Sequence, residues 1–86
     1  MKKIIGVAIK VNGEVFAMLK PCGHSDVYKW LHNVDMDISN SCICEGFITD
    51  TNEFVDRYKA AKIAKKANQI INDDFVEYGL YSEDVW

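Results

Sequence analysis

Two apolar stretches near the amino terminus flank Asn12-Gly13 and predict a β-hairpin over residues 3–20. Asn-Gly is the preferred pair for a two-residue turn, because both turn positions must accept a positive φ. With that turn, one face of the hairpin is bulky and carries Ile5, Val7, Ile9, Phe16 and Met18. The other face carries Gly6, Ala8, Val15, Ala17 and Leu19. A solvated hairpin alternates apolar with polar residues, so both faces are expected to be covered, the second by another subunit.

Apolar residues at helical spacing predict two helices further along the chain. The first is short, follows the expected N-cap Ser25, and has an apolar face of Val27, Trp30, Leu31 and Val34. The second spans residues 57–71 after the N-cap Asp56, and its buried stripe is Ala60, Ile63, Ala64, Ala67, Ile70 and Ile71. Residues 42–49 and the pair 54–55 are predicted strands on either side of the turn 50–53.

These elements define the expected fold class, which is α+β. A small antiparallel sheet starts with the N-terminal β-hairpin and packs with a short helix and a longer C-terminal amphipathic helix. A chain of 86 residues has material for one core, so residues 1–86 are expected to form a single domain. After residue 72 the pattern is irregular, and large side chains predict an anchored segment through Phe75, Tyr78, Leu80, Tyr81, Val85 and Trp86.

Composition indicates the cellular compartment in which the chain is expected. Hydrophobic residues make up 49% of the chain, which is enough for folding. No apolar run approaches the ~20 residues of a membrane span, and no signal-peptide pattern follows Met1. Three cysteines, an odd number, fit a reducing cytosol better than a disulfide framework. A cytoplasmic protein without a membrane partner is therefore expected.

The charges are unevenly distributed along the chain. The net charge of −3 argues against nucleic acid as a partner, because binding to phosphates needs a surplus of lysine and arginine. Half of the ten cations nevertheless lie in the second predicted helix, at Arg57, Lys59, Lys62, Lys65 and Lys66. Such a stripe is usually a solvated helix face. It leaves open a protein-interaction module or inhibitor that uses residues 57–71 against an acidic partner.

The sequence motifs do not indicate a metal site or a catalytic centre. Cys22 and His24, like Cys42 and Cys44, are separated by one residue, whereas paired zinc ligands are usually spaced by about two to four. Buried free thiols are the expected alternative. The chain has no G-x-S-x-G, H-E-x-x-H or phosphate-loop lysine motif. We therefore expect a binding protein rather than an enzyme, without a cofactor.

Arg57, the only arginine, is the first candidate for a ligand contact. It lies at the start of a helix, where unpaired backbone N–H groups favour an anion, and arginine can bind a phosphate with two parallel hydrogen bonds. Thr49 begins the preceding turn, and Phe54 beside that turn could stack on a base. Asp56 would repel the anion, and a surface pair between Arg57 and an acid is the alternative. His24 has a similar pair of interpretations, as a ligand donor or as a locally satisfied side chain.

Three blocks of the chain together resemble a family of small phage proteins, the Thoeris anti-defence sponges. The blocks are residues 2–19 with the Asn-Gly hairpin, Gly46-Phe47-Ile48-Thr49 leading to Phe54-Val55-Asp56-Arg57 and residues 60–64, and the ending at residues 80–86. Members of that family sequester a cyclic ADP-ribose isomer, which is the signal of bacterial TIR-domain immunity, without cleaving it.

The resemblance implies a homo-oligomer built on a dimer in the host bacterial cytoplasm, with ligand pockets near the subunit boundary. The implied ligand-binding residues are Arg57, His24, Thr49, Phe16, Trp30 and Phe54. Arg57 would bind the pyrophosphate, and one of the three aromatic rings would pack against the adenine. The chain departs from the family where His24 lacks the second histidine that relatives often carry, and where Asn52 replaces a glycine.

Overall fold

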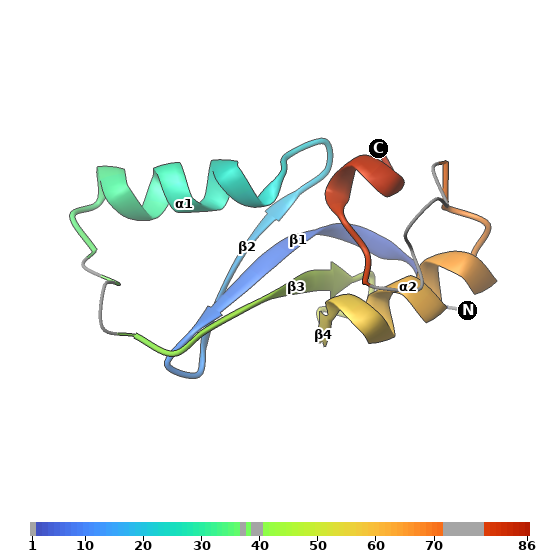
Figure 1. Ribbon diagram of the computed structural model, residues 1–86, viewed down its shortest axis with the longest axis horizontal. Coiled ribbons are helices and arrows are strands. Elements are labelled where there is room, and N and C mark those ends of the chain that lie inside the picture. Colours follow the sequence, from blue (N-terminus) through green and yellow to red (C-terminus); the bar gives the residue numbers. More distant parts are fainter. Residues whose placement is uncertain (1, 37, 39–40, 72–78) are drawn as a thin grey trace.

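The computed structural model describes residues 2–36, 38, 41–71 and 79–86, which build a four-stranded antiparallel sheet with two helices (Figure 1). The elements are β1 (Ile4–Val11), β2 (Glu14–Leu19), α1 (His24–Asn33), β3 (Ile43–Thr49), β4 (Phe54–Asp56), α2 (Arg57–Lys66) and the 3-10 turn η2 (Ser82–Asp84). The strand order is β2-β1-β3-β4, so β2 and β4 form the two edges of the sheet. The predicted α+β fold with its N-terminal hairpin is confirmed.

The hairpin turn has the backbone that its sequence requires. Asn12 and Gly13 both have positive φ, at 50° and 92°, and the strands pair Ile9 with Phe16 as predicted. The prediction that Ile5 belongs to the buried face of the hairpin is wrong. The pairing of β1 with β3 shifts register between Ile4 and Gly6, so fully buried Ile4 joins the core and Ile5 is only half-buried.

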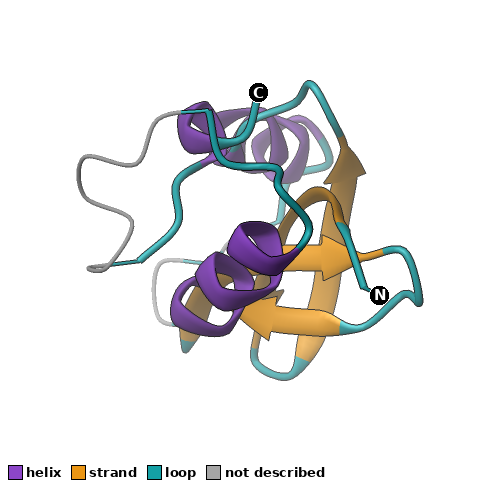
Figure 2. Cartoon of the chain, turned by 90° about the vertical axis from the view of Figure 1, so that its right-hand side faces the viewer, coloured by secondary structure: helices purple, strands orange, loops and turns teal. Residues whose placement is uncertain are grey.

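Both helices pack on the same face of the sheet (Figures 1 and 2). Helix α1 contacts β1 and β2, whereas α2 contacts β3, β4 and, to a smaller extent, β1. The core between them consists of Ile4, Val7, Ile9, Val11, Val27, Leu31, Phe47, Val55, Ala60, Ala61, Ala64 and Leu80. Within the described residues no helix covers the other face, and Val15 and Leu19 are 43% and 63% exposed there. Coverage of that face by another subunit stays a prediction.

Helix α1 begins at His24 and not after Ser25. Gly23 is the N-cap, and its N–H donates to the Asp26 carboxylate over 2.8 Å. Asp26, the third residue of the helix, therefore fixes the start of the helix by binding the N-cap backbone. The apolar face is also narrower than predicted, because Val27 and Leu31 are buried while Trp30 is 46% exposed.

Helix α2 ends at Lys66, so the predicted extension to residue 71 is wrong and both helices have ten residues. Asn68 adopts the left-handed conformation with φ 60°, and the N–H of Gln69 donates to the Ala64 carbonyl over 2.9 Å. This geometry ends helices by satisfying their last carbonyls. The Gln69 amide then donates to the Ile4 carbonyl and accepts from the Ile4 N–H, both over 2.8 Å.

Three of the predicted C-terminal anchors are confirmed, whereas the fourth described one, Tyr81, is 45% exposed. Leu80 is fully buried, Val85 and Trp86 pack against the core, and the Trp86 indole donates to the Cys22 carbonyl over 3.0 Å. The expected anchors Phe75 and Tyr78 lie outside the described residues.

The sheet depends on a glycine at position 46. A Cβ atom there would lie 2.2 Å from the Val55 carbonyl oxygen and 2.7 Å from the Phe54 ring. We predict that Gly46→Ala lowers the free energy of unfolding by about 3 kcal/mol or more, because backbone must move to admit the methyl group. Gly23→Ala is the control, since its nearest contact is a side-chain oxygen at 3.3 Å. Equal urea midpoints for the two variants would contradict the steric argument.

Candidate functional site

The structure brings Phe16 and Trp30 together, two of the predicted ligand-binding residues. Phe16 projects from β2, Trp30 projects from α1, and their ring centroids are 6.0 Å apart. They border a cavity of about 340 Å³, which we call the β2–α1 hollow and which is lined by Val15, Phe16, Ala17, Met18, Val27 and Trp30. Buried Val27 and Leu31 hold α1 against the sheet and leave Trp30 above the edge strand.

The β2–α1 hollow suits a flat, largely apolar group. Its volume lies at the lower end of the roughly 300–1,000 Å³ usual for ligand sites. All six lining residues have apolar side chains, and two of them are aromatic. A planar ring can therefore stack in the hollow, whereas a phosphate would find no cation in its lining.

His24 is locally satisfied. Its Nε2 donates to the Gly46 carbonyl over 2.7 Å, and its ring stands edge-on to Phe47 with centroids 5.1 Å apart. The hydrogen bond connects the first residue of α1 to β3. Of the two interpretations of His24, the geometry favours the local one.

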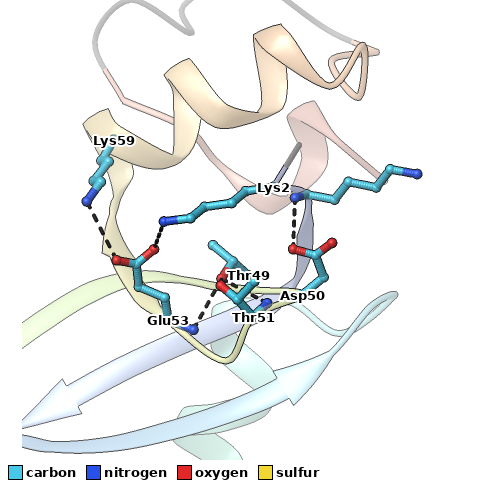
Figure 3. A network of polar contacts seen from close by, with 7 residues as sticks. Lys2, Thr49, Asp50, Thr51, Glu53 and Lys59 are labelled. Atoms are coloured by element: carbon cyan, nitrogen blue, oxygen red, sulfur yellow. Dashed lines mark hydrogen bonds and ion pairs between the residues drawn. The ribbon is translucent and has the colours of Figure 1, made fainter.

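Thr49 organises the turn between β3 and β4 (Figure 3). Its side chain is fully buried, and its hydroxyl accepts from the backbone N–H groups of Thr51 and Glu53 over 3.3 and 3.2 Å. It also lies 2.9 Å from the Thr51 hydroxyl. These contacts occupy the group that the resemblance assigned to a ligand.

A polar network beside the turn was not foreseen from the sequence (Figure 3). Glu53 accepts a hydrogen bond from the Lys2 ammonium, and the Lys59 ammonium lies 3.8 Å from its other oxygen. The hydrogen bond with Lys2, and then the charges of both lysines, lower the pKa of the Glu53 carboxyl. Because the groups are solvent-exposed, we assign the network a modest role in holding the turn against α2.

Arg57 binds the C-terminal segment of its own chain. Its Nε donates to the Leu80 carbonyl over 3.1 Å, and its guanidinium carbon lies 3.9 Å from the centroid of the Tyr81 ring. The Leu80 N–H in turn donates to the Arg57 carbonyl over 3.0 Å. Asp56 caps α2 as predicted, accepting from the Lys59 N–H over 2.7 Å, so a carboxylate already occupies this helix end.

Phe54 lies on the sheet face opposite the helices. Its ring covers Gly46, and the Lys10 ammonium is 4.6 Å from the ring centroid. The six predicted ligand-binding residues are thus divided among several places. Of these residues, Phe16 and Trp30 line a common cavity.

Among the described residues, the other reactive side chains lie outside the lining of the hollow. Burial, followed by a hydrogen bond to Glu45, raises the pKa of Tyr28 to about 12, so its hydroxyl stays protonated at neutral pH. Cys42 and Cys44 are exposed, which corrects the expectation of buried thiols: Cys42 precedes β3, and Cys44 points away from the core. In the described part of the chain, no group of three or more metal-ligating side chains occurs.

Comparison with known proteins gives a family assignment. The family model for the Phage T4 y16D protein matches residues 3–86, which is nearly the whole chain. No curated protein and no solved structure matches the chain. None of the helices among the described residues is long and apolar enough to cross a membrane.

We predict that Arg57→Ala lowers the free energy of unfolding by about 1–3 kcal/mol, because it removes the hydrogen bond to Leu80 and the contact with Tyr81. Lys66→Ala, at an exposed position of the same helix, should change it by less than about 0.5 kcal/mol. Urea unfolding measures both. Unchanged stability in Arg57→Ala would show that these contacts do not hold the C-terminal segment.

Proposed function

The chain belongs to the Phage T4 y16D protein family, and we propose that this phage protein binds and sequesters a cyclic ADP-ribose isomer without cleaving it. This phage protein would act in the host bacterial cytoplasm, where it would withdraw the signal made by TIR-domain immunity. The observation that supports the proposal is the pair of aromatic rings, Phe16 and Trp30, at the β2–α1 hollow.

The aromatic pair provides a place for the adenine of the ligand. Stacking of a base on an aromatic side chain contributes about 1–3 kcal/mol and needs only an accessible ring face. Trp30 is 46% exposed and tilted by 41° relative to Phe16, so the two rings form an open wedge. The site is assigned to the base alone, because the lining of the hollow carries no charge that would meet the pyrophosphate.

Sequestration is the activity that such a lining supports. None of the six lining residues has a side chain that can act as a general acid or base. A base held there would meet no general acid or base in the lining, which agrees with the proposed sequestration. Slow release, and not chemical turnover, would determine how well the protein removes the signal.

We predict that Trp30→Ala weakens binding of a cyclic ADP-ribose isomer roughly 5- to 150-fold, as expected for the loss of one stacked base. Isothermal titration of the purified protein measures the affinity. Tyr58→Ala is the matched control, because Tyr58 is an aromatic residue on α2 that is 63% exposed and lies outside the hollow.

The bound ligand is then recovered by denaturing the protein and analysed by mass spectrometry. Intact ligand supports sequestration, and cleaved ligand would replace it with an enzymatic function. Absence of binding to every cyclic ADP-ribose isomer would refute the proposal. Titration with adenosine separates the contribution of the base from that of the phosphates.

A second candidate function rests on the cations of α2. Lys59, Lys62, Lys65 and Lys66 are all exposed, and the last two lie at the C-terminal end of the helix. This surface could bind an acidic protein of the host. In that case Lys62→Glu combined with Lys65→Glu should abolish a salt-sensitive coprecipitation from infected cells. The double variant Lys29→Glu and Lys3→Glu is the control. If both double variants recover the same amount of the acidic protein, the α2 surface is not its binding site.

A further inference from the structure

Among the described residues, no strand pairs with the outer side of the edge strand β2. It pairs with β1 without a register shift, and the residues from Val15 to Leu19 include neither proline nor charge. The other edge, β4, has three residues, ends in Asp56 and leads directly into α2. Proteins usually protect sheet edges with charges, proline, bulges or short strands, and β4 is protected in this way. In β2 the only charged residue is Glu14 at its start, and Lys20 directly follows its end.

The hairpin turn determines which backbone groups of β2 are available. In an antiparallel pair, residues alternately direct their N–H and C=O groups toward the partner strand and away from it. The two-residue turn pairs Val11 with Glu14, and the Lys20 N–H donates to the Ile5 carbonyl over 3.0 Å. Even-numbered residues of β2 therefore bond to β1. Val15, Ala17 and Leu19 direct their backbone groups outward.

We propose that β2 pairs antiparallel with β2 of a second copy of this chain, about a twofold axis at Ala17. Ala17 then faces the partner's Ala17, Val15 faces the partner's Leu19, and Glu14 faces the partner's Lys20. The outward groups of Val15, Ala17 and Leu19 form the interchain hydrogen bonds. The strand pair joins the two sheets into one continuous sheet.

Charge and side-chain size select this register. Glu14 and Lys20 meet at both ends of the strand pair, so opposite charges face each other twice. A twofold axis at Phe16 also lets the outward backbone groups form hydrogen bonds. It places Glu14 opposite Met18, however, and Leu19 opposite the turn residue Gly13. An axis at Met18 places Val15 opposite Pro21, which has no N–H to donate. At the Ala17 axis the self-facing side chain is a single methyl group.

The pairing buries part of the apolar surface at the β2 edge that the single chain leaves exposed. Val15 and Leu19, which are 43% and 63% exposed, become cross-strand neighbours. Phe16 and Met18 also face each other across the interface, on the side where Trp30 is exposed. The β2–α1 hollow then lies at the subunit boundary. The proposal does not depend on the identity of any ligand.

A charge exchange tests the pairing and its register. We expect the ligand-free protein to be a dimer in sedimentation equilibrium. Glu14→Lys alone, or Lys20→Glu alone, should raise the dimer dissociation constant about tenfold or more, because like charges then face each other at both ends. The two changes combined should restore it to within about threefold. Glu83→Lys and Lys62→Glu, at exposed positions away from β2, are controls with the same charge changes.

A cross-link reports the axis directly. Hydrogen-bonded antiparallel residues have Cα atoms about 5.5 Å apart, which a disulfide can span. With Cys22, Cys42 and Cys44 replaced by serine, Ala17→Cys should form a covalent dimer under mild oxidation, and Ser25→Cys should not. A monomeric wild type would overturn the proposal. The proposal would also be overturned if the single charge changes left the dimer dissociation constant unchanged, or if the combined change did not restore it.

Discussion

The two-residue turn at Asn12-Gly13 fixes the register of β1 against β2, and most other features of the molecule depend on that register. It directs Val7, Ile9 and Phe16 toward the helices. It also decides which backbone groups of β2 bond to β1 and which point to solvent. A slip of one residue would exchange the two faces and expose the core side chains. The hollow, the open edge and the core are consequences of one local conformation.

Hydrogen bonds between distant parts of the chain hold the remaining elements against this hairpin. Gln69 binds both backbone groups of Ile4, Arg57 binds Leu80, and the Trp86 indole binds the Cys22 carbonyl. Each contact joins a segment outside the sheet to its start, to α2 or to the entrance of α1. A small core supplies limited stability, so such polar contacts are a substantial fraction of what holds the chain together.

Local chemistry made the hairpin, β3, the β3–β4 turn and the Asp56 cap predictable, because each depends on residues adjacent in sequence. The helix ends were less predictable. Asn68 ends α2 in a left-handed conformation that a helical pattern of alanine and isoleucine does not reveal. The candidate site was predictable only in part. Phe16 and Trp30 converge because Val27 and Leu31 dock α1, whereas the partner of Arg57 lies 23 residues away at Leu80.

The two surfaces assigned to binding share residues, and this has a thermodynamic consequence. Phe16 and Met18 line the β2–α1 hollow and also belong to the edge that would pair with a second copy. A ligand in the hollow and a partner strand on β2 therefore act on the same side chains. If the ligand binds the dimer more tightly than the monomer, it must strengthen dimerisation by the same factor, and if it competes with the partner's side chains it must weaken dimerisation equally. Measuring the dimer dissociation constant with and without ligand gives the sign of that coupling, and so decides whether the hollow is completed or filled by the partner subunit.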